Sequence, residues 1–212
     1  MSDLTKLKQA ITKGDRETAI GETQRLLDEG EEVQNILDHG LIAAMDDVGE
    51  RFSEGLLFVP HMLRSAKTMQ GCMELLEPLF KEGEVVSKGK VIIGTVKGDL
   101  HDIGKNLVSM MLEGAGFEIN DLGVDVAPET FALKAKELEA DVVALSALLS
   151  TTMPSMPATI EALEKAEVRD KTKVIIGGAP VTKRYAEKIS ADGYAPDGGA
   201  AVVEVKRLLG IA

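Results

Sequence analysis

The hydrophobic pattern of this chain changes near residue 88, and this change constrains the fold more than any other feature. Before it, apolar residues recur at helical spacing with almost no strand signal. After it, short strand-like runs alternate with helical stretches. The segment between them, GEVVSKGK over 83–90, is polar and contains two glycines, as is typical of a linker. The sequence therefore predicts two domains, residues 1–88 and 89–212.

The first region predicts a bundle of four helices. Apolar residues repeat at helical spacing over 4–11, and a second run follows Asp15, whose side chain is suited to capping a helix. A third run covers 33–52, and a fourth begins near Pro60, a residue tolerated in a first helical turn. Four amphipathic helices with short connections indicate an antiparallel bundle.

The second region predicts an α/β domain with a flavodoxin-like (Rossmann-like) parallel sheet of five strands. Strand–helix alternation gives such a sheet, with helices on both faces and a ligand crevice at the carboxyl ends of the strands. The expected strands are 90–96, 117–123, 141–147, 173–179 and a short one near Tyr194. The expected helices are 103–115, 129–139, 154–166, 182–190 and 198–209.

Composition excludes several classes of function. A net charge of −11, with 3% aromatic residues and no Trp, is a poor match to the phosphates and bases of nucleic acid. No window is apolar enough for a membrane helix, and the polar N-terminus does not resemble a signal peptide, so we expect a cytoplasmic protein that binds no membrane. The single cysteine, Cys72, lies in an apolar run and is expected to be buried.

The first strand runs into GDLHDIGKN, which contains Asp99, His101 and Gly104 as D-x-H-x-x-G. A histidine at the carboxyl end of a strand faces the crevice. Asp99 could fix the tautomer of the His101 ring and leave its other nitrogen free to bind metal. Gly104 would allow a large flat ligand to approach the backbone. The alternative is a structural loop histidine, with Asp99 as a helix cap.

Two further strand ends carry distinctive residues. Hydroxyl groups follow the third strand at Ser146, Ser150, Thr151 and Thr152, either around a ligand or as a cap for the next helix. The fourth strand ends in GGAP at 177–180, which forms either a groove without side chains or a plain strand-to-helix turn. Because G-x-G-x-x-G and the Walker pattern are absent, a dinucleotide or ATP site is disfavoured.

In the helical half, Phe52, Val59 and Met62 could share one face, although core packing is the ordinary explanation of such a stripe. We expect His39 and His61 to be ordinary bundle residues. No set of Cys or carboxylate residues at ligand spacing indicates a zinc site.

Taken together, VKGDLHDIGKNLV, LSALLSTTM, IIGGAPVT and FVPHMLRSAKTM resemble the cobalamin-binding region of methionine synthase and the corrinoid proteins of methyltransferase systems. The resemblance covers nearly the whole chain, with the four pieces in the expected places. It implies that a cobalamin binds with its dimethylbenzimidazole base displaced from cobalt by a protein histidine.

The resemblance assigns a role to each matching residue. His101 matches the cobalt ligand, Asp99 its hydrogen-bond partner, and Thr152 stands where methionine synthase has the serine of this relay. The residues implied to contact the nucleotide tail are Ser146, Leu148, Gly177 and Gly178. Ser150, which stands where methionine synthase has a threonine, is implied to contact the cofactor. The loop residues implied to contact the cofactor are Gly98, Leu100, Asp102, Ile103 and Gly104. The residues implied to shield the upper cobalt face are Phe52, Val59 and Met62.

The function implied is that of a carrier that takes a methyl group on cob(I)alamin and passes it on, without being the catalytic subunit itself. The expected partners are a substrate:corrinoid methyltransferase, a second methyltransferase that uses tetrahydrofolate or coenzyme M, and a reductive activase. The methyl donor could be a methylamine, methanol, a betaine or a methoxylated aromatic. Alternatives are a B12-binding sensor, the cobalamin-binding subunit of a radical mutase, or a flavodoxin-like protein without B12.

Overall fold

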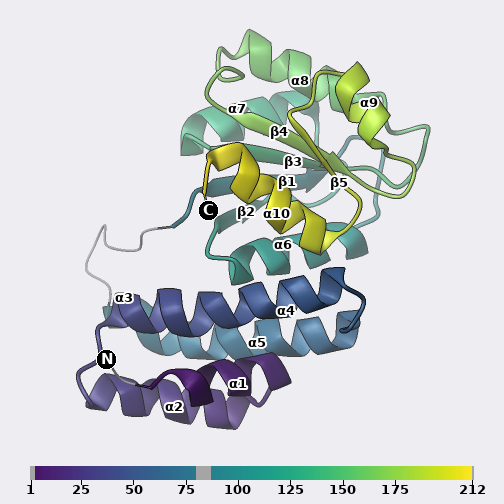
Figure 1. Ribbon diagram of the computed structural model, residues 1–212. Helices are drawn as coiled ribbons and strands as arrows, with labels where there is room; N and C mark the ends of the chain where they lie inside the picture. The colour runs from purple at the N-terminus through teal and green to yellow at the C-terminus, as the bar shows by residue number, and fades with distance from the viewer. Residues whose placement is uncertain (1–2, 80–86, 212) are drawn as a thin grey trace. The chain divides into compact units, whose positions relative to one another are not determined.

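The computed structural model describes residues 3–79 and 87–211 of the chain. By its contacts the chain divides into two compact units (Figure 1), one of residues 1–86 with 114–116 and one of 87–113 with 117–212. The first four residues of the linker expected over 83–90 lie outside the described residues.

The helical unit contains the helices expected from the sequence, with one difference. The α-helices and shorter helical segments are α1 (Thr5–Lys13), α2 (Arg16–Asp28), α3 (Val33–Asn35), η1 (Ile36–Ile42), α4 (Ala43–Ser53), α5 (Val59–Leu76) and η2 (Glu77–Leu79). Asp15 caps α2 as expected, since its carboxylate accepts a hydrogen bond from the Thr18 N–H. The run over 33–52 is helical throughout, but its middle part, η1, is a π-helix rather than an α-helix.

The core of the helical unit is aliphatic and methionine-rich. Helices α1, α2, α4 and α5 pack against one another and bury the apolar stripes that the sequence pattern predicts. The completely or almost completely buried side chains include Leu7, Ile11, Leu26, Ile36, Leu41, Val48, Met62 and Leu76. Cys72 is buried among them as expected, and burial raises the pKa of its thiol.

The α/β unit is built on a parallel five-stranded sheet in the order β2-β1-β3-β4-β5. Its strands are β1 (Lys90–Thr95), β2 (Glu118–Asp121), β3 (Val142–Ser146), β4 (Lys173–Gly177) and β5 (Gly193–Ala195). All neighbouring strands are parallel, and β3 pairs with β1 and β4 through the register Thr95–Ser146–Gly177. The expected flavodoxin-like sheet is therefore confirmed, and the ends of β1, β3 and β4 lie side by side.

Five helices cover the two faces of this sheet. They are α6 (Ile103–Gly114), α7 (Pro128–Leu138), α8 (Ser155–Lys165), α9 (Lys183–Lys188) and α10 (Gly198–Leu209). Helices α7, α8 and α9 lie on one face, and α6 and α10 lie on the other (Figure 1). The larger core lies beneath α7 and α8, where the fully buried Phe131, Met156 and Leu163 pack against alternate strand residues such as Ile92 and Val143.

Among the described residues, no helix has both the length and the apolar character that crossing a membrane would require.

Candidate functional site

The loop between β1 and α6 presents Asp99 and His101 at the carboxyl edge of the sheet. Gly98 begins this turn with a φ of 84°, a conformation that favours glycine, and its N–H donates to the Asp125 carboxylate at 2.7 Å. The Thr95 hydroxyl donates to the His101 carbonyl at 2.8 Å, which ties the loop back to its strand. The loop is therefore fixed from both sides before any ligand is considered.

Asp99 orients the imidazole of His101. Its Oδ1 lies 2.7 Å from His101 Nδ1 and accepts a further hydrogen bond from the His101 backbone N–H at 3.1 Å. The His101 side chain is 51% exposed, whereas that of Asp99 is completely buried. Since Nδ1 is held by the carboxylate, Nε2 is the nitrogen available to bind a metal.

The other carboxylate oxygen of Asp99 is held by the loop after β3. Its Oδ2 accepts hydrogen bonds from the Thr152 hydroxyl at 2.7 Å and from the backbone N–H groups of Leu148 and Leu149 at 2.8 and 3.2 Å. Burial by itself raises the pKa of Asp99, but the hydrogen bonds from Thr152, His101 and Leu148 outweigh it and hold the pKa well below its ordinary value. Asp99 is therefore a buried, ionised carboxylate.

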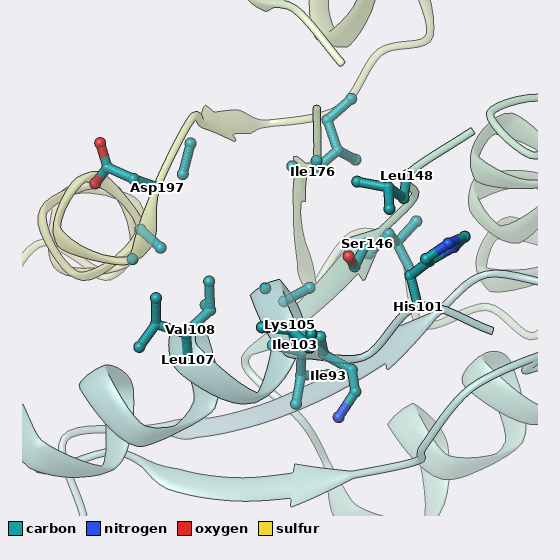
Figure 2. A pocket seen from close by; sticks show the side chains of 18 of the residues that line it. Ile93, His101, Ile103, Lys105, Leu107, Val108, Ser146, Leu148, Ile176 and Asp197 are labelled. Carbon is teal, nitrogen blue, oxygen red and sulfur yellow. The ribbon is translucent and has the colours of Figure 1, made fainter. Parts of the chain in front are cut away.

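A cavity of about 610 Å³ lies at the same edge of the sheet, within the range typical of ligand pockets. Figure 2 shows its lining, in which His101 and Leu148 stand on one side and Asp197 on the other. Its walls come from β1, β3, β4, α6 and the start of α10. The lining residues named by the sequence are Leu100, His101, Asp102, Ile103, Gly104, Ser146, Leu148, Gly177 and Gly178.

The glycines of the lining have different reasons to be glycine. A Cβ on Gly178, whose φ is 125°, would lie 1.9 Å from the Ala147 carbonyl oxygen, and one on Gly177 would lie 2.8 Å from that of Ala195. Backbone packing alone therefore requires both. A Cβ on Gly104 would meet no protein atom within 4 Å. Close packing within the protein thus leaves Gly104 unexplained, and the approach of a large ligand fits it.

The remaining predicted residues of the α/β unit lie either behind the lining or outside it. Gly98, Asp99 and Thr152 lie behind the lining and support it through hydrogen bonds. The interpretation of Thr152 as a helix cap is wrong, because no side chain caps α8 and the Thr152 hydroxyl binds Asp99 instead. Ser150 is exposed and lies outside the residues that line the cavity.

The three residues expected to shield the upper cobalt face belong to the helical unit. Met62 is buried within it, Val59 is 40% exposed, and Phe52 is intermediate. Their neighbours Leu56 and Phe58 are each 66% exposed. The most exposed apolar side chains of this region are therefore two residues that the sequence pattern did not single out.

Sequence reasoning missed several lining residues. Leu107 and Val108 follow the motif on α6, and Asp197 and Gly198 begin α10. Lys105 is almost fully buried, and its ammonium group pairs with Asp121 and donates to Asn106 at 2.6 Å. The PDGGA segment after β5 was a usable signal for the α10 side of the cavity, since it places a helix start at a strand end.

Comparison with known proteins identifies the family. A protein family described as "B12 binding domain" matches residues 89–206, and a second with the same description matches residues 4–77. The chain belongs to the B12-binding family. This B12-binding protein is 43% identical over 208 residues to "Trimethylamine corrinoid protein 2" of Methanosarcina mazei, covering 97% of this chain and 95% of that relative. It is also 43% identical over 208 residues to "Dimethylamine corrinoid protein" of Methanosarcina barkeri, covering 97% of each.

Solved structures agree with this assignment. A cobalamin-binding protein from Desulfitobacterium hafniense superposes with a TM-score of 0.82 at 31% identity, over 98% of this chain and 99% of that one. The Methanosarcina barkeri methanol:cobalamin methyltransferase complex MtaBC contains a chain with the same fold, with a TM-score of 0.82 at 23% identity over 98% of this chain and 79% of that one. The resemblance inferred from the sequence is confirmed: this is a corrinoid protein, and its cofactor is a cobalamin with its cobalt.

The residues at the sheet edge fit such a cofactor. Among the described residues no cluster of three His, Cys, Asp or Glu side chains could hold a metal ion. A corrin ring supplies four nitrogen ligands to its metal, so a single histidine nitrogen is the donor set that such a cofactor needs from the protein. His101 offers that nitrogen beside an apolar cavity and beside Gly104, where no protein side chain obstructs the approach.

Proposed function

We propose that this chain is a methyl carrier that accepts a methyl group from a substrate:corrinoid methyltransferase and delivers it to a second methyltransferase. The observation that carries the proposal is the Thr152–Asp99–His101 relay, which leaves His101 Nε2 available at the rim of the cavity. The bound corrinoid would supply a cobalt centre that can take up and release a methyl group.

In this proposal His101 is the residue that would hold the cobalt of the corrinoid. Asp99 keeps a proton on Nδ1, which directs the lone pair of Nε2 outward. His101 would hold the cobalt of the bound corrinoid through Nε2, while the buried carboxylate of Asp99 would fix the orientation of the ring. Thr152 and the backbone N–H groups of Leu148 and Leu149 keep Asp99 ionised for that purpose.

The cavity would accept the displaced nucleotide tail. Ser146, Leu148, Gly177 and Gly178 line it, while Ser150 lies outside the lining and would contact the cofactor only beyond the cavity. The loop from Leu100 to Gly104 would face the corrin ring, since Leu100 is 71% exposed and Ile103 is 85% exposed. Exposed apolar side chains of this size suit a large ligand that covers them on binding.

We further propose residues 1–88 as a cap domain over the upper face of the corrin, and residues 89–212 as the B12-binding domain. Phe52, Val59 and Met62 would shield the methyl group, together with the exposed Leu56 and Phe58. A cap over the reactive face must move aside for each partner, which makes it a mobile lid in the methyl-transfer cycle.

The proposed methyl donor is a methylamine, because the relatives that match over nearly their whole length include trimethylamine and dimethylamine corrinoid proteins. The first partner would then be a methylamine:corrinoid methyltransferase. The structural neighbour in a complex with a methyltransferase supports a partner of this class. The second partner would transfer the methyl group to tetrahydrofolate or coenzyme M, and a reductive activase would restore inactivated cobalt.

The test is reconstitution of the full chain with hydroxocobalamin, followed by desalting and optical spectroscopy. Wild-type protein is expected to stay coloured, and His101→Ala is expected to bind cofactor whose spectrum lacks the features of an imidazole ligand. A colourless wild-type protein, or identical spectra for the two, would contradict the proposal. Methyl transfer is then assayed with methylamine, methanol and aryl ether methyltransferases. Selective retention of an adenosyl upper ligand would favour a mutase subunit instead.

A further inference from the structure

We propose that the cavity beside His101 selects corrinoids by their lower base, favouring an apolar aromatic base such as dimethylbenzimidazole or a phenol over a purine. The inference rests on the proposed function, in which the displaced nucleotide tail enters this cavity. It concerns which of the naturally varied lower bases this chain accepts.

The walls of the cavity are apolar. Ile93 of β1, Ala144 of β3 and Ile175 of β4 form the sheet side, while Leu107 and Val108 face them from α6. Figure 2 shows Leu107 and Val108 on the wall below Asp197, with Ile93 and Ile176 on other sides of the same space. Apolar walls favour a base that presents carbon atoms in every direction.

The polar side chains of the lining are mostly committed to other groups. Among the described lining residues, five carry polar side chains: His101, Asp102, Lys105, Ser146 and Asp197. Lys105 pairs with Asp121, and Figure 2 shows its nitrogen directed away from the enclosed space. Asp197 accepts a hydrogen bond at 2.8 Å from the Ala200 N–H at the start of α10, and its carboxylate points outward.

The two other rim side chains are engaged as well. Asp102 accepts a hydrogen bond from Asn106 at 3.2 Å, and His101 is held by Asp99. Within the described lining, this leaves the Ser146 hydroxyl as the one side-chain group with no hydrogen-bond partner in the protein. In Figure 2 its oxygen points into the space between Leu148 and Val108.

One hydroxyl matches the needs of an apolar base and falls short of those of a purine. Displaced dimethylbenzimidazole has one uncoordinated ring nitrogen, and a phenol has none. Adenine has an exocyclic amine and several ring nitrogens, which lose their water on entering the cavity. Each polar group buried without a partner weakens binding by about tenfold or more. We therefore expect the adenine-containing corrinoid to bind at least about tenfold more weakly.

The experiment measures dissociation constants by equilibrium dialysis of the full-length apoprotein against the hydroxo forms of cobalamin, cresolyl cobamide and adenyl cobamide. The expected order of affinity places cobalamin and the cresolyl form together and the adenyl form weaker. Adenine leaves cobalt more easily than benzimidazole does in free solution, so the bases also differ before they meet the protein.

The contribution of that difference cancels when the ratio of the adenyl to the cobalamin dissociation constant is compared between protein variants. Leu107→Asn places an amide in the cavity wall, and Leu133→Asn makes the same change at an exposed site on α7. The ratio of the adenyl to the cobalamin dissociation constant is expected to fall by severalfold in Leu107→Asn and to stay constant in Leu133→Asn. If circular dichroism shows Leu107→Asn unfolded, the nearly isosteric Val108→Thr takes its place.

Equal affinities for all three corrinoids, together with a ratio unchanged by the wall variant, would overturn the selectivity and leave the methyl-carrier proposal standing. A failure of wild-type apoprotein to bind any of the three would overturn the proposed function itself, and the selectivity with it. An adenyl form that binds more tightly than cobalamin in the wild type would also overturn the selectivity.

Discussion

The two units of this protein bury their polar groups in different ways. In the helical unit the most deeply buried polar side chains are neutral, and Thr23 is satisfied by the Ala19 carbonyl of its own helix. In the α/β unit the most deeply buried polar side chains include the charged Asp99 and Lys105, whose partners come from other elements. Burying a charge is costly unless hydrogen bonds or an opposite charge compensate it, so the α/β unit depends on these contacts in a way that the helical unit does not.

Glycine substitutions should give the largest difference in stability between the two units. Gly178→Ala is expected to destabilise the α/β unit by roughly 3 kcal/mol, because the new Cβ meets the Ala147 carbonyl at a φ of 125°. Gly21→Ala, in the middle of α2 with nothing within 4 Å, should stabilise the helical unit by about 0.5–1 kcal/mol. Urea unfolding followed by circular dichroism measures both, and a neutral Gly178→Ala would contradict the packing described for β4.

Neutralising a buried carboxylate is expected to have the next largest effect. Asp99→Asn should lower the free energy of unfolding by about 2 kcal/mol at pH 7, because it weakens the hydrogen bonds from Thr152, Leu148 and His101. Glu22→Gln in the helical unit should cost about 1 kcal/mol or less, since the side chains of its cations, Lys6 and Arg25, are 69% and 41% exposed.

The pH dependence provides a second measure of the Asp99 contribution. The folded pKa of Asp99 is depressed, so its stabilisation is complete above the unfolded pKa of about 3.9 and is lost as the pH falls below it. Wild-type protein should therefore lose more stability between pH 5 and pH 3 than Asp99→Asn does. Parallel pH profiles for the two proteins would contradict an ionised, hydrogen-bonded Asp99.

Two buried threonines offer a closely matched comparison. Thr152→Val removes a hydroxyl that donates to a carboxylate, and should cost about 1.5 kcal/mol. Thr23→Val removes a hydroxyl that donates to a carbonyl within its own helix, and should cost about 0.5 kcal/mol. Thr152→Ser should recover most of the loss. Thermal unfolding of the three variants tests this order, and equal losses at both sites would show that the charge on Asp99 is unimportant.

The smallest effects on stability are expected at exposed apolar residues. Ile103→Ser and Leu56→Ser should each change the stability of the apoprotein by less than about 0.5 kcal/mol, since these side chains are 85% and 66% exposed. Corrinoid binding should nevertheless be affected in Ile103→Ser, because Ile103 lines the cavity. Equilibrium dialysis with hydroxocobalamin is expected to show weaker binding in Ile103→Ser. Unchanged binding would remove Ile103 from the proposed cofactor contacts.

Most of the fold could be predicted from hydrophobic periodicity, and the π-helix shows where that reading was too coarse. The pattern predicts one continuous helix over 33–52, and the structure has a π-helix in the middle of it. Leu37 and Leu41 are four residues apart, as in an ordinary α-helix, so the apolar spacing does not distinguish the π-helical part. Farther along, Met45 and Val48 have the α-helical spacing of three. The change from π-helix to α-helix therefore could not be read from the apolar pattern.

The positions of the site residues that directly follow strands could be predicted from the sequence. Asp99 and His101 follow β1, so their place at the crevice followed from the topology of a parallel sheet. The backbone donors of Leu148 and Leu149 could not be foreseen, because any residue carries an N–H group and only the loop conformation aims it at Asp99. The Lys105–Asp121 ion pair was missed for a related reason: a lysine in an amphipathic helix is ordinarily exposed.

Asp99 also connects two loops mechanically. One of its oxygens holds His101 after β1, and the other holds Thr152, Leu148 and Leu149 after β3. A pull on the histidine is therefore transmitted through a single rigid carboxylate to a loop whose leucines are 42% and 43% exposed. Under the proposed function, a partner that rests on those leucines would be in mechanical contact with the histidine without touching the cobalt.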